Sequence, residues 1–273
     1  MEVTIRRLAT LEEYAAAEQL LQDCWQTGPL EAIPTHLMLT IQNEAGLVLG
    51  AFTSENRMVG FLLGFLSREG ATLKHHSHMT GVHPEFRDRG IAYRLKLAQR
   101  DFVIAEGLDL CTWTFDPLEC RNAILNIAKL GATSHAYKRN VYGALLGQLN
   151  TELPTDRLLV QWEVRSERVC RCVETGQHVE APISNVLLSE VTIRESVPDL
   201  VAIQESVGQR VIGVHIPTRF QKIKQARPDA AMAWRMGIRE FFEKAFSAGY
   251  SVVNITSDRA FPEMLSVYTL TLP

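Results

Sequence analysis

The sequence predicts an α/β protein in which a mixed β-sheet is flanked by helices and followed by a smaller C-terminal α/β segment. Three observations support this. Strand and helix patterns alternate along the chain, residues 46–82 contain three strand patterns in succession, and residues 89–106 place apolar side chains at helical spacing. The 273 residues, 46% of them hydrophobic and 22% charged, suffice for one large domain or for a domain with a companion.

The N-terminal half is expected to follow the order β-α-β-β-β-α-β-α-β. Thr10 and Glu13 form a capping box that begins the first helix, and Gly107 and Gly131 end the two later ones. In the helix over 89–106, Lys96 is expected on the exposed face. Helices are predicted over 10–25, 89–106 and 119–130, and strands over 3–7, 46–53, 58–67, 72–82, 108–115 and 158–164.

The C-terminal half begins with a polar stretch, residues 166–190, which contains Gly176 and Pro182 and is expected to be a linker or an irregular excursion. We therefore divide the chain into a domain over 1–165, a linker over 166–190 and a subdomain over 191–273. In the subdomain we predict a strand over 191–194 followed by a short helix, an apolar stretch over 211–216, a helix over 228–248, and strands over 250–255 and 265–272.

Composition limits the classes of function. A net charge of -3 and a pI near 6.3 argue against a binder of nucleic acid or of anionic membranes. Residues 1–7 alternate apolar and polar side chains, unlike a secretory signal, and no window approaches the ~20 apolar residues of a membrane span. Five scattered cysteines are an odd number, so we expect a reducing, cytoplasmic location.

Residues 82–92 connect a predicted strand to a predicted helix through a turn suited to phosphate. Gly90 and Ala92 are small enough for a ligand to approach the backbone, and a helix N-terminus offers free N–H groups. Arg87 and Arg89 add positive charge. An ordinary helix start with solvated arginines has the same residues. The position after a three-stranded meander, and before another strand and helix, favours a diphosphate site.

The stretch from Val3 to about Val164, with Arg87-x-x-Gly90-x-Ala92 at its centre, resembles the GNAT superfamily of acyl-CoA N-acyltransferases. The resemblance implies a seven-stranded mixed sheet that is splayed between its fourth and fifth strands, with the pantetheine arm of acyl-CoA in that cleft. It also implies a set of residues that bind acetyl-CoA or another acyl-CoA as cosubstrate: Gly81, Val82, Arg87, Asp88, Arg89, Gly90, Ile91, Ala92, Asn122 and Asn126.

Residues 76–79, 114–118 and 122–123 further resemble a bacterial branch of predicted GNAT enzymes, some of which are associated with N-succinylamino acid metabolism. This resemblance makes succinyl-CoA a second donor to consider. The acceptor would then be a small-molecule amine such as an amino acid.

Acyl transfer from a thioester to an amine needs a base. In the histone-acetyltransferase branch the base is a glutamate eleven residues before the Q/R of the signature, and here that position is His76. His78 is the reserve candidate because alternate strand residues share a face. Both imidazoles could instead be satisfied by neighbours on a sheet face. We expect no metal, because His75 and His76 point to opposite faces and Cys170-Arg171-Cys172 lacks a second pair of thiols.

The usual GNAT acid is a tyrosine four residues before the glycine that ends the fourth helix, and here that position is Ile127. Tyr142 is our candidate, with Tyr137 or His135 as alternatives. The thiolate could also leave unaided. The run over 137–140 either binds a carboxylate on the acceptor or donor, or is a solvated charge run.

The predicted function is therefore transfer of an acetyl or succinyl group from coenzyme A to a small-molecule amine by direct attack. The alternative is a non-catalytic acyl-CoA sensor or assembly module. A nucleotide-binding protein is disfavoured, because neither G-x-x-x-x-G-K-[S/T] nor G-x-G-x-x-G occurs. No nucleic-acid or membrane partner is expected. The segment after 191 would cap the acceptor site, form a homodimer or cover the sheet.

Overall fold

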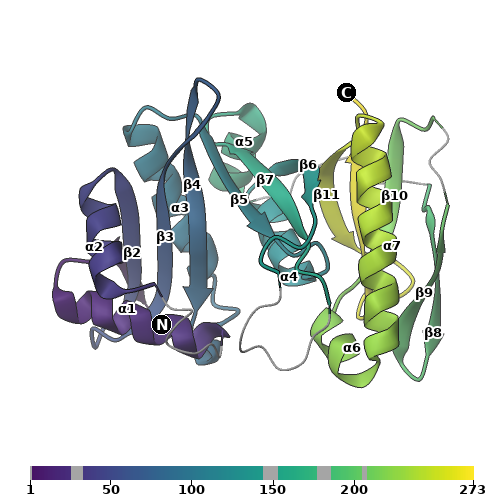
Figure 1. The fold of residues 1–273 in the computed structure, drawn as a ribbon, viewed down its shortest axis with the longest axis horizontal. Helices are drawn as coiled ribbons and strands as arrows, with labels where there is room; N and C mark the ends of the chain where they lie inside the picture. The colour runs from purple at the N-terminus through teal and green to yellow at the C-terminus, as the bar shows by residue number, and fades with distance from the viewer. Residues whose placement is uncertain (1, 26–32, 144–152, 177–185, 205–207) are drawn as a thin grey trace. The chain divides into compact units, whose positions relative to one another are not determined.

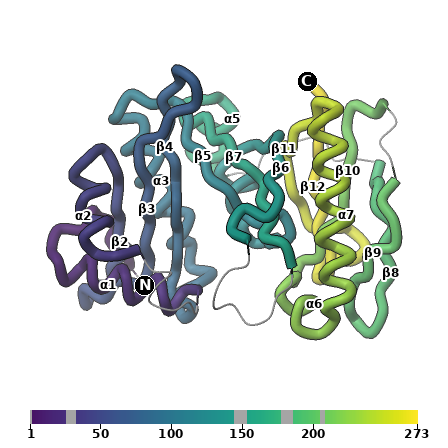
Figure 2. The backbone as a smooth tube through the Cα atoms, in the orientation of Figure 1, coloured from purple at the N-terminus to yellow at the C-terminus, as the bar shows by residue number. Residues whose placement is uncertain are grey.

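The computed structural model describes residues 2–25, 33–143, 153–176, 186–204 and 208–273. The chain divides into two compact units. The first holds residues 2–25, 33–113 and 163–165, and the second holds residues 114–143, 153–162 and the described residues from 166 onward. Figure 1 labels most helices and strands of both units, and Figure 2 traces the same backbone.

The first unit is built on the strand order β1-β2-β3-β4-β5. The first four strands, β1 (Val3–Arg7), β2 (Gly46–Thr53), β3 (Met58–Glu69) and β4 (Thr72–Val82), pair antiparallel. β5 (Leu110–Phe115) pairs parallel to β4. A parallel neighbour needs a crossover connection, which the helix α3 (Ile91–Ala105) supplies. The mixed sheet expected for this part of the chain is confirmed.

Helices cover both faces of this sheet, and the alternation of β3 explains why. Phe61 and Leu63 lie in one apolar cluster with residues of α1 (Leu11–Trp25) and α2 (Thr35–Asn43). Leu62 lies between them in sequence and packs in the opposite cluster with Ile91 and Leu95 of α3. Successive strand residues point to opposite faces, so a continuous apolar run of this kind predicts a strand that is buried on both sides.

The second unit has the strand order β7-β6-β11-β12-β10 and a separate hairpin of β8 and β9. Trp234 of α7 donates a hydrogen bond to the Pro198 carbonyl of β9, and Phe242 of α7 packs edge-on against Tyr268 of β12. The strands are β6 (Thr133–Lys138), β7 (Arg157–Glu163), β8 (Ser189–Arg194), β9 (Val197–Ile203), β10 (Val211–Pro217), β11 (Ser251–Ser257) and β12 (Leu265–Thr271). The helical segments are α4 (Cys120–Ala123), the π-helical η3 (Ile124–Lys129), α5 (Glu167–Thr175), α6 (Phe220–Ala226) and α7 (Pro228–Ser247).

The C-terminal strands belong to the same sheet as β6, because Val252 of β11 pairs antiparallel with Ser134. The division at 166–190 stays a prediction. Within that segment the structure has helix α5, which begins where the Ser166 hydroxyl accepts a hydrogen bond from the Val169 N–H. Val169 and Cys172, three residues apart, are its buried side.

The predicted helices over 10–25, 89–106 and 228–248 and the predicted strands are confirmed to within about two residues. The short helix expected after 194 is wrong. Glu195 and Ser196 both have positive φ, 51° and 62°, and form the tight turn of the β8–β9 hairpin. Such turns favour Asn and Gly, so the sequence carried no signal for this one. Helices α2 and α6 were not predicted; α2 buries only Met38.

None of the described helices is both long and apolar enough to cross a membrane.

Candidate active site

The candidate site is built on β4, where polar side chains alternate between the two faces of the sheet. His75 and Ser77 are buried toward α3, because Gln99 and Lys96 of α3 hydrogen-bond to them. The rings of His76 and His78 lie 5.4 and 5.9 Å from the ring of Phe65, which packs against the cluster under α1 and α2. The two predicted catalytic histidines thus share one face.

A β-bulge lies at this pair of histidines. On β3 the register passes from Leu63, opposite Met79, directly to Gly64, opposite Ser77, so His78 is the extra residue on β4. The ring centroids of His76 and His78 are 6.3 Å apart. His78, at the bulge, is exposed, whereas His76 is half-buried.

Two features suit this pair to base catalysis. His76 Nδ1 lies 3.5 Å from the hydroxyl oxygen of Thr112, a buried residue of β5 that orients the ring. Although His78 is exposed, the protein around it removes part of the hydration of its ring and lowers its pKa. A histidine with a lowered pKa is neutral at pH 7 and has a free nitrogen to accept a proton.

The strands beside this pair form a fork. β4 and β5 pair at only two positions, His75 with Cys111 and His76 with Thr112. β4 continues for six more residues, to Val82. The backbone of β4 beyond the fork therefore has peptide groups on its β5 side that this short ladder does not use, as the splayed sheet implied by the GNAT resemblance requires.

The turn after β4 has the backbone form that a phosphate-binding loop needs. A short 3-10 turn η2 (Pro84–Phe86) follows the strand, and Asp88 and Gly90 adopt left-handed conformations with φ of 63° and 73°. Helix α3 begins at Ile91, and no side chain from the described residues caps it. A β-carbon at Gly90 would meet open space, so the approach to this helix N-terminus is clear.

The predicted phosphate-binding residues differ in what their side chains do. Arg87 is exposed, yet its guanidinium donates to the Cys24 carbonyl oxygen at 3.1 Å and the Val82 carbonyl oxygen at 3.3 Å. It therefore anchors the turn to α1 and β4. Arg89 stacks on Phe86 at 5.2 Å from the ring centroid, and it stays exposed beside the helix start together with Asp88. Gly81 is required by packing, because a β-carbon there would lie 2.9 Å from the Trp25 ring.

The remaining predicted site residues lie in the second unit. Asn122 is exposed on α4. Asn126 is buried in η3, where its backbone carbonyl oxygen accepts a hydrogen bond from the Ala132 N–H. Tyr142 is 46% exposed, and its ring lies 5.1 Å from the Arg157 guanidinium. Ile127, at the position of the usual tyrosine acid, is fully buried.

The alternative acid Tyr137 is a poor donor to a substrate. Its hydroxyl hydrogen-bonds Asp156 at 2.9 Å, and burial together with that carboxylate raises the pKa of the phenol well above its usual range. In the charge run over 137–140, Arg139 pairs with Glu243 at 2.5 Å, and the Asn140 N–H donates to Asp156. His135, the other alternative, is exposed.

Sequence reasoning missed a buried polar cluster behind the histidines. Lys96 is 3% exposed, which corrects its expected place on the outer face of α3. Its ammonium donates to Ser77 Oγ at 2.7 Å and to Gln99 Oε1 at 3.1 Å, and it lies 3.8 Å from the centroid of the Trp113 ring. Lys96 and Gln99 are three residues apart, so their side chains meet on one face of α3, but this spacing does not mark that face as buried.

The hydrogen bonds of this cluster fix the tautomer of His75. Because Gln99 Oε1 accepts from Lys96, the Gln99 amide N–H₂ must donate to His75 Nε2, at 3.0 Å. The His75 proton is then on Nδ1, a buried atom without a hydrogen-bond partner among the described residues. Burial and the positive charge of Lys96 lower the pKa of His75 to about 3.

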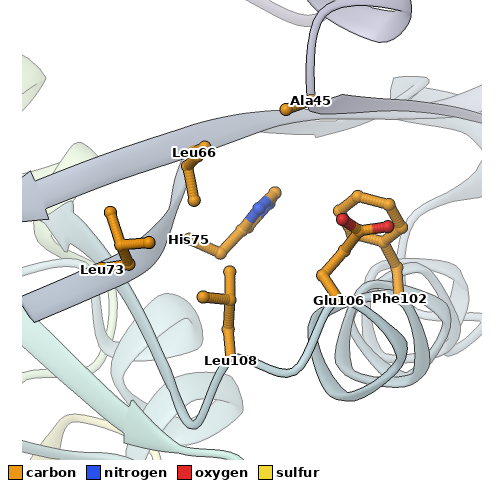
Figure 3. A pocket seen from close by; sticks show the side chains of 7 residues that line it. All are labelled: Ala45, Leu66, Leu73, His75, Phe102, Glu106 and Leu108. Atoms are coloured by element: carbon orange, nitrogen blue, oxygen red, sulfur yellow. The ribbon is translucent and has the colours of Figure 1, made fainter.

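A hollow of about 130 Å³ borders His75 on this same face, with Leu66, Leu73, Phe102 and Leu108 around it and Glu106 beside Phe102 (Figure 3). It lies on the face opposite His76, because adjacent strand residues point apart. It is therefore not the place where an acceptor would meet the candidate base. A second, more open hollow of about 320 Å³ lies between α1 and the β2–β3 turn, next to Asp23, Arg57 and His83.

Within the described ranges, no group of three or more His, Cys, Asp or Glu side chains could hold a metal ion.

Comparison with known proteins gives structural likeness only. No protein-family model matches the sequence, and no curated protein matches it. Among solved structures, the ribosomal-protein-S18-alanine N-acetyltransferase from Escherichia coli has a TM-score of 0.48 and 16% identity over 60% of this chain and 96% of its own. A putative GNAT-family acetyltransferase from Desulfovibrio desulfuricans has a TM-score of 0.47 and 15% identity, and the match covers 60% of this chain and 99% of that one. Aminoglycoside 6'-acetyltransferase type Ii has a TM-score of 0.46 and 16% identity, again with 60% of this chain and 99% of that one covered.

Residues 3–163 have the mixed α/β sheet flanked by helices that the sequence predicted. The order of strands and helices, the β4–β5 fork and the turn at Gly90 agree with what the GNAT resemblance implies. Identities of 14–18% are too low to transfer substrates or residue roles from those structures to this chain.

Proposed function

We propose that the protein is an acyl-CoA-dependent N-acyltransferase that acylates a small-molecule amine by direct attack. The observation that carries the proposal is the arrangement on one strand of the first unit. β4 leaves its parallel neighbour at the fork, carries His76 and His78 there, and ends in the turn that opens the N-terminus of α3. A thioester donor such as acyl-CoA has an extended arm and a diphosphate. The β4–β5 fork suits the arm, and the turn before α3 suits the diphosphate.

The turn before α3 is the feature that favours binding of the diphosphate. The uncapped start of α3 has backbone N–H groups and the positive end of the helix dipole, both of which favour an anion. Gly90 leaves the approach open, and Arg89 adds an exposed positive charge. Arg87 would contribute by holding the turn through its bonds to α1 and β4.

The chemistry would proceed in one addition and one elimination. His76, alone or through a water, takes a proton from the acceptor ammonium, and the amine lone pair forms the new C–N bond at the thioester carbonyl. The C–S bond then breaks, its electron pair leaves with sulfur, and the proton ends on the thiolate to give free thiol. His78 is the second candidate for this proton transfer, because its ring lies on the same face.

The donor is proposed to be acetyl-CoA or succinyl-CoA, and the acceptor an amine such as that of an amino acid. Binding is tested by thermal unfolding of the purified chain with each acyl-CoA at about 1 mM. A ligand at 100 times its Kd stabilises by about 2.7 kcal/mol, which for a chain of this size raises Tm by roughly 5 °C. We expect such a rise with at least one donor.

Matched charge reversals localise the binding. Arg89→Glu beside the helix start should abolish most of the rise in Tm, whereas Arg68→Glu, at an exposed arginine near the other end of the β3–β4 hairpin, should leave it unchanged. No rise with either donor would overturn the proposal. Binding without thiol release across a broad panel of amines would favour the non-catalytic acyl-CoA sensor.

A further inference from the structure

Lys96 connects both arms of the β4–β5 fork. The last paired residues are His76 on β4 and Thr112 on β5. The next residues along the two strands are Ser77 and Trp113, and Lys96 contacts both, with its ammonium 2.7 Å from Ser77 Oγ and 3.8 Å from the Trp113 ring centroid. The ammonium therefore lies on the α3 side of the point where the strands diverge.

No carboxylate among the residues that the structure describes forms an ion pair with Lys96. Both of its hydrogen-bond acceptors, Ser77 Oγ and Gln99 Oε1, are uncharged. Burial lowers the pKa of the ammonium to about 8, so it is mostly protonated at pH 7. An ion without a counter-ion in the protein interior is costly, and its field is weakly screened.

The titratable groups that face Lys96 leave this field in place. On β4, His75 has a pKa of about 3 and is neutral at pH 7. On β5, burial raises the pKa of the Cys111 thiol to about 12, so the thiol is neutral as well. Gln99, the neighbour on α3, does not titrate, and His76 points to the other face of the sheet.

Acyl transfer at the fork would create negative charge in two places. As the amine lone pair forms the C–N bond, charge develops on the carbonyl oxygen, and as the C–S bond breaks, it passes to the sulfur. This chain has Ile127 where a tyrosine acid is usual, so the departing thiolate would gain from a positive charge near the fork. A fixed positive charge in a low-dielectric site stabilises such charge without reorganising.

We propose that Lys96 is a positioning residue for the acyl transfer, which holds Ser77 and Trp113 at the fork and stabilises, through its positive charge, the oxyanion and thiolate that develop there. This inference rests on the proposed function. It differs from a purely structural role in one measurable respect, because the charge can be removed by pH as well as by substitution.

The test is the pH dependence of kcat at saturating acyl-CoA for the wild type, Lys96→Met and Lys96→Arg. Lys74→Met is the matched control, because Lys74 is also buried on β4 but is ion-paired with Glu69 near the far end of the strand. We expect Lys96→Met to lower kcat about 10- to 100-fold while acyl-CoA still raises Tm. Lys74→Met should keep wild-type turnover.

The arginine variant separates charge from shape. As pH rises through about 8, the wild type should lose kcat relative to Lys96→Arg, because arginine stays protonated. An equal pH dependence of the two proteins would overturn the inference, as would wild-type kcat in Lys96→Met. Should Lys96→Met fail to fold, the pH dependence of kcat in the wild type and Lys96→Arg still tests whether the charge of Lys96 contributes. A wild type without acyl-CoA binding or thiol release would overturn the proposed function itself.

Discussion

The two compact units differ in whether their buried cationic side chains are paired with a carboxylate. In the second unit, Arg239 of α7 forms two hydrogen bonds with Asp156, at 2.7 and 2.8 Å, and Arg235 forms two with Asp116, at 2.9 and 2.5 Å. In the first unit, Lys96 is 3% exposed and has no carboxylate partner among the described residues. The paired arginines join α7 to the strands and loops beneath it, whereas the unpaired lysine leaves a field at the fork.

This difference separates two roles for a buried cation. A bidentate arginine–carboxylate pair cancels its own field and fixes geometry, so its loss is felt in stability. A lone ammonium among neutral acceptors costs stability and keeps its field, so its loss is felt in chemistry.

The largest effect on stability is expected from Arg239→Met. Asp156 is fully buried, and without Arg239 its carboxylate keeps, among the described residues, only the uncharged donors Tyr137 and the Asn140 N–H. We expect the free energy of unfolding to fall by about 3–5 kcal/mol, measured by urea denaturation. The double variant Arg239→Met/Asp156→Asn should recover part of the loss.

Arg139→Met is the control on the same surface, because Arg139 is 63% exposed in its pair with Glu243. It should change stability little. If Arg239→Met and Arg139→Met lowered the free energy of unfolding equally, the buried ion pair of α7 would not be a main source of stability.

A second large effect is expected at acid pH from His75. Its pKa is lowered from 6.5 to about 3 in the folded state, so between these values the unfolded chain binds a proton that the folded chain does not. The contribution of His75 is thus present above pH 6.5 and is lost as pH falls toward 3. It amounts to roughly 5 kcal/mol at most.

Urea denaturation at pH 4 and pH 7 should therefore show a smaller loss of stability on acidification for His75→Gln than for the wild type. His36→Gln, at an exposed histidine of α2, should behave as the wild type. An unchanged acid slope in His75→Gln would mean that the ring protonates normally in the folded chain.

The smallest effect is expected from Lys96→Met at neutral pH, where stability should equal or exceed that of the wild type because an unpaired charge is removed. Between pH 8 and 10.5 the folded wild type has released the Lys96 proton and the unfolded chain has not, so wild-type stability should rise relative to Lys96→Met. The relative gain is about 3 kcal/mol at most. A large loss at pH 7 would show that Lys96 is mainly structural.

Local patterns were enough to predict most of the fold. The apolar runs of β2 and β3, the stripe of α3 and the glycines that end helices each depend on neighbouring residues alone. The β8–β9 turn at Glu195 and Ser196 escaped prediction, because these residues seldom adopt positive φ. Helix α2 escaped as well, since a helix that buries only Met38 leaves almost no periodic signal.

Only part of the candidate site could be predicted from the sequence. The alternation of β4 placed His76 and His78 on one face, and the spacing of Arg87 and Gly90 indicated the turn. The bulge at His78 depends on register with β3, and the burial of Lys96 depends on Ser77 and Trp113 from two other strands. Such contacts join residues that are distant in sequence, so no local pattern reveals them.

The most direct test of the account is thiol release from acetyl-CoA and succinyl-CoA by the wild type and His76→Ala across a panel of small amines, with acyl-CoA binding measured on the same samples. We predict turnover by the wild type and a fall of about 10²- to 10⁴-fold in His76→Ala, with the ligand-induced rise in Tm retained. His36→Ala should match the wild type. Undiminished turnover in His76→Ala would contradict the assignment of the base, and no thiol release by the wild type with any amine would contradict the proposed acyl transfer.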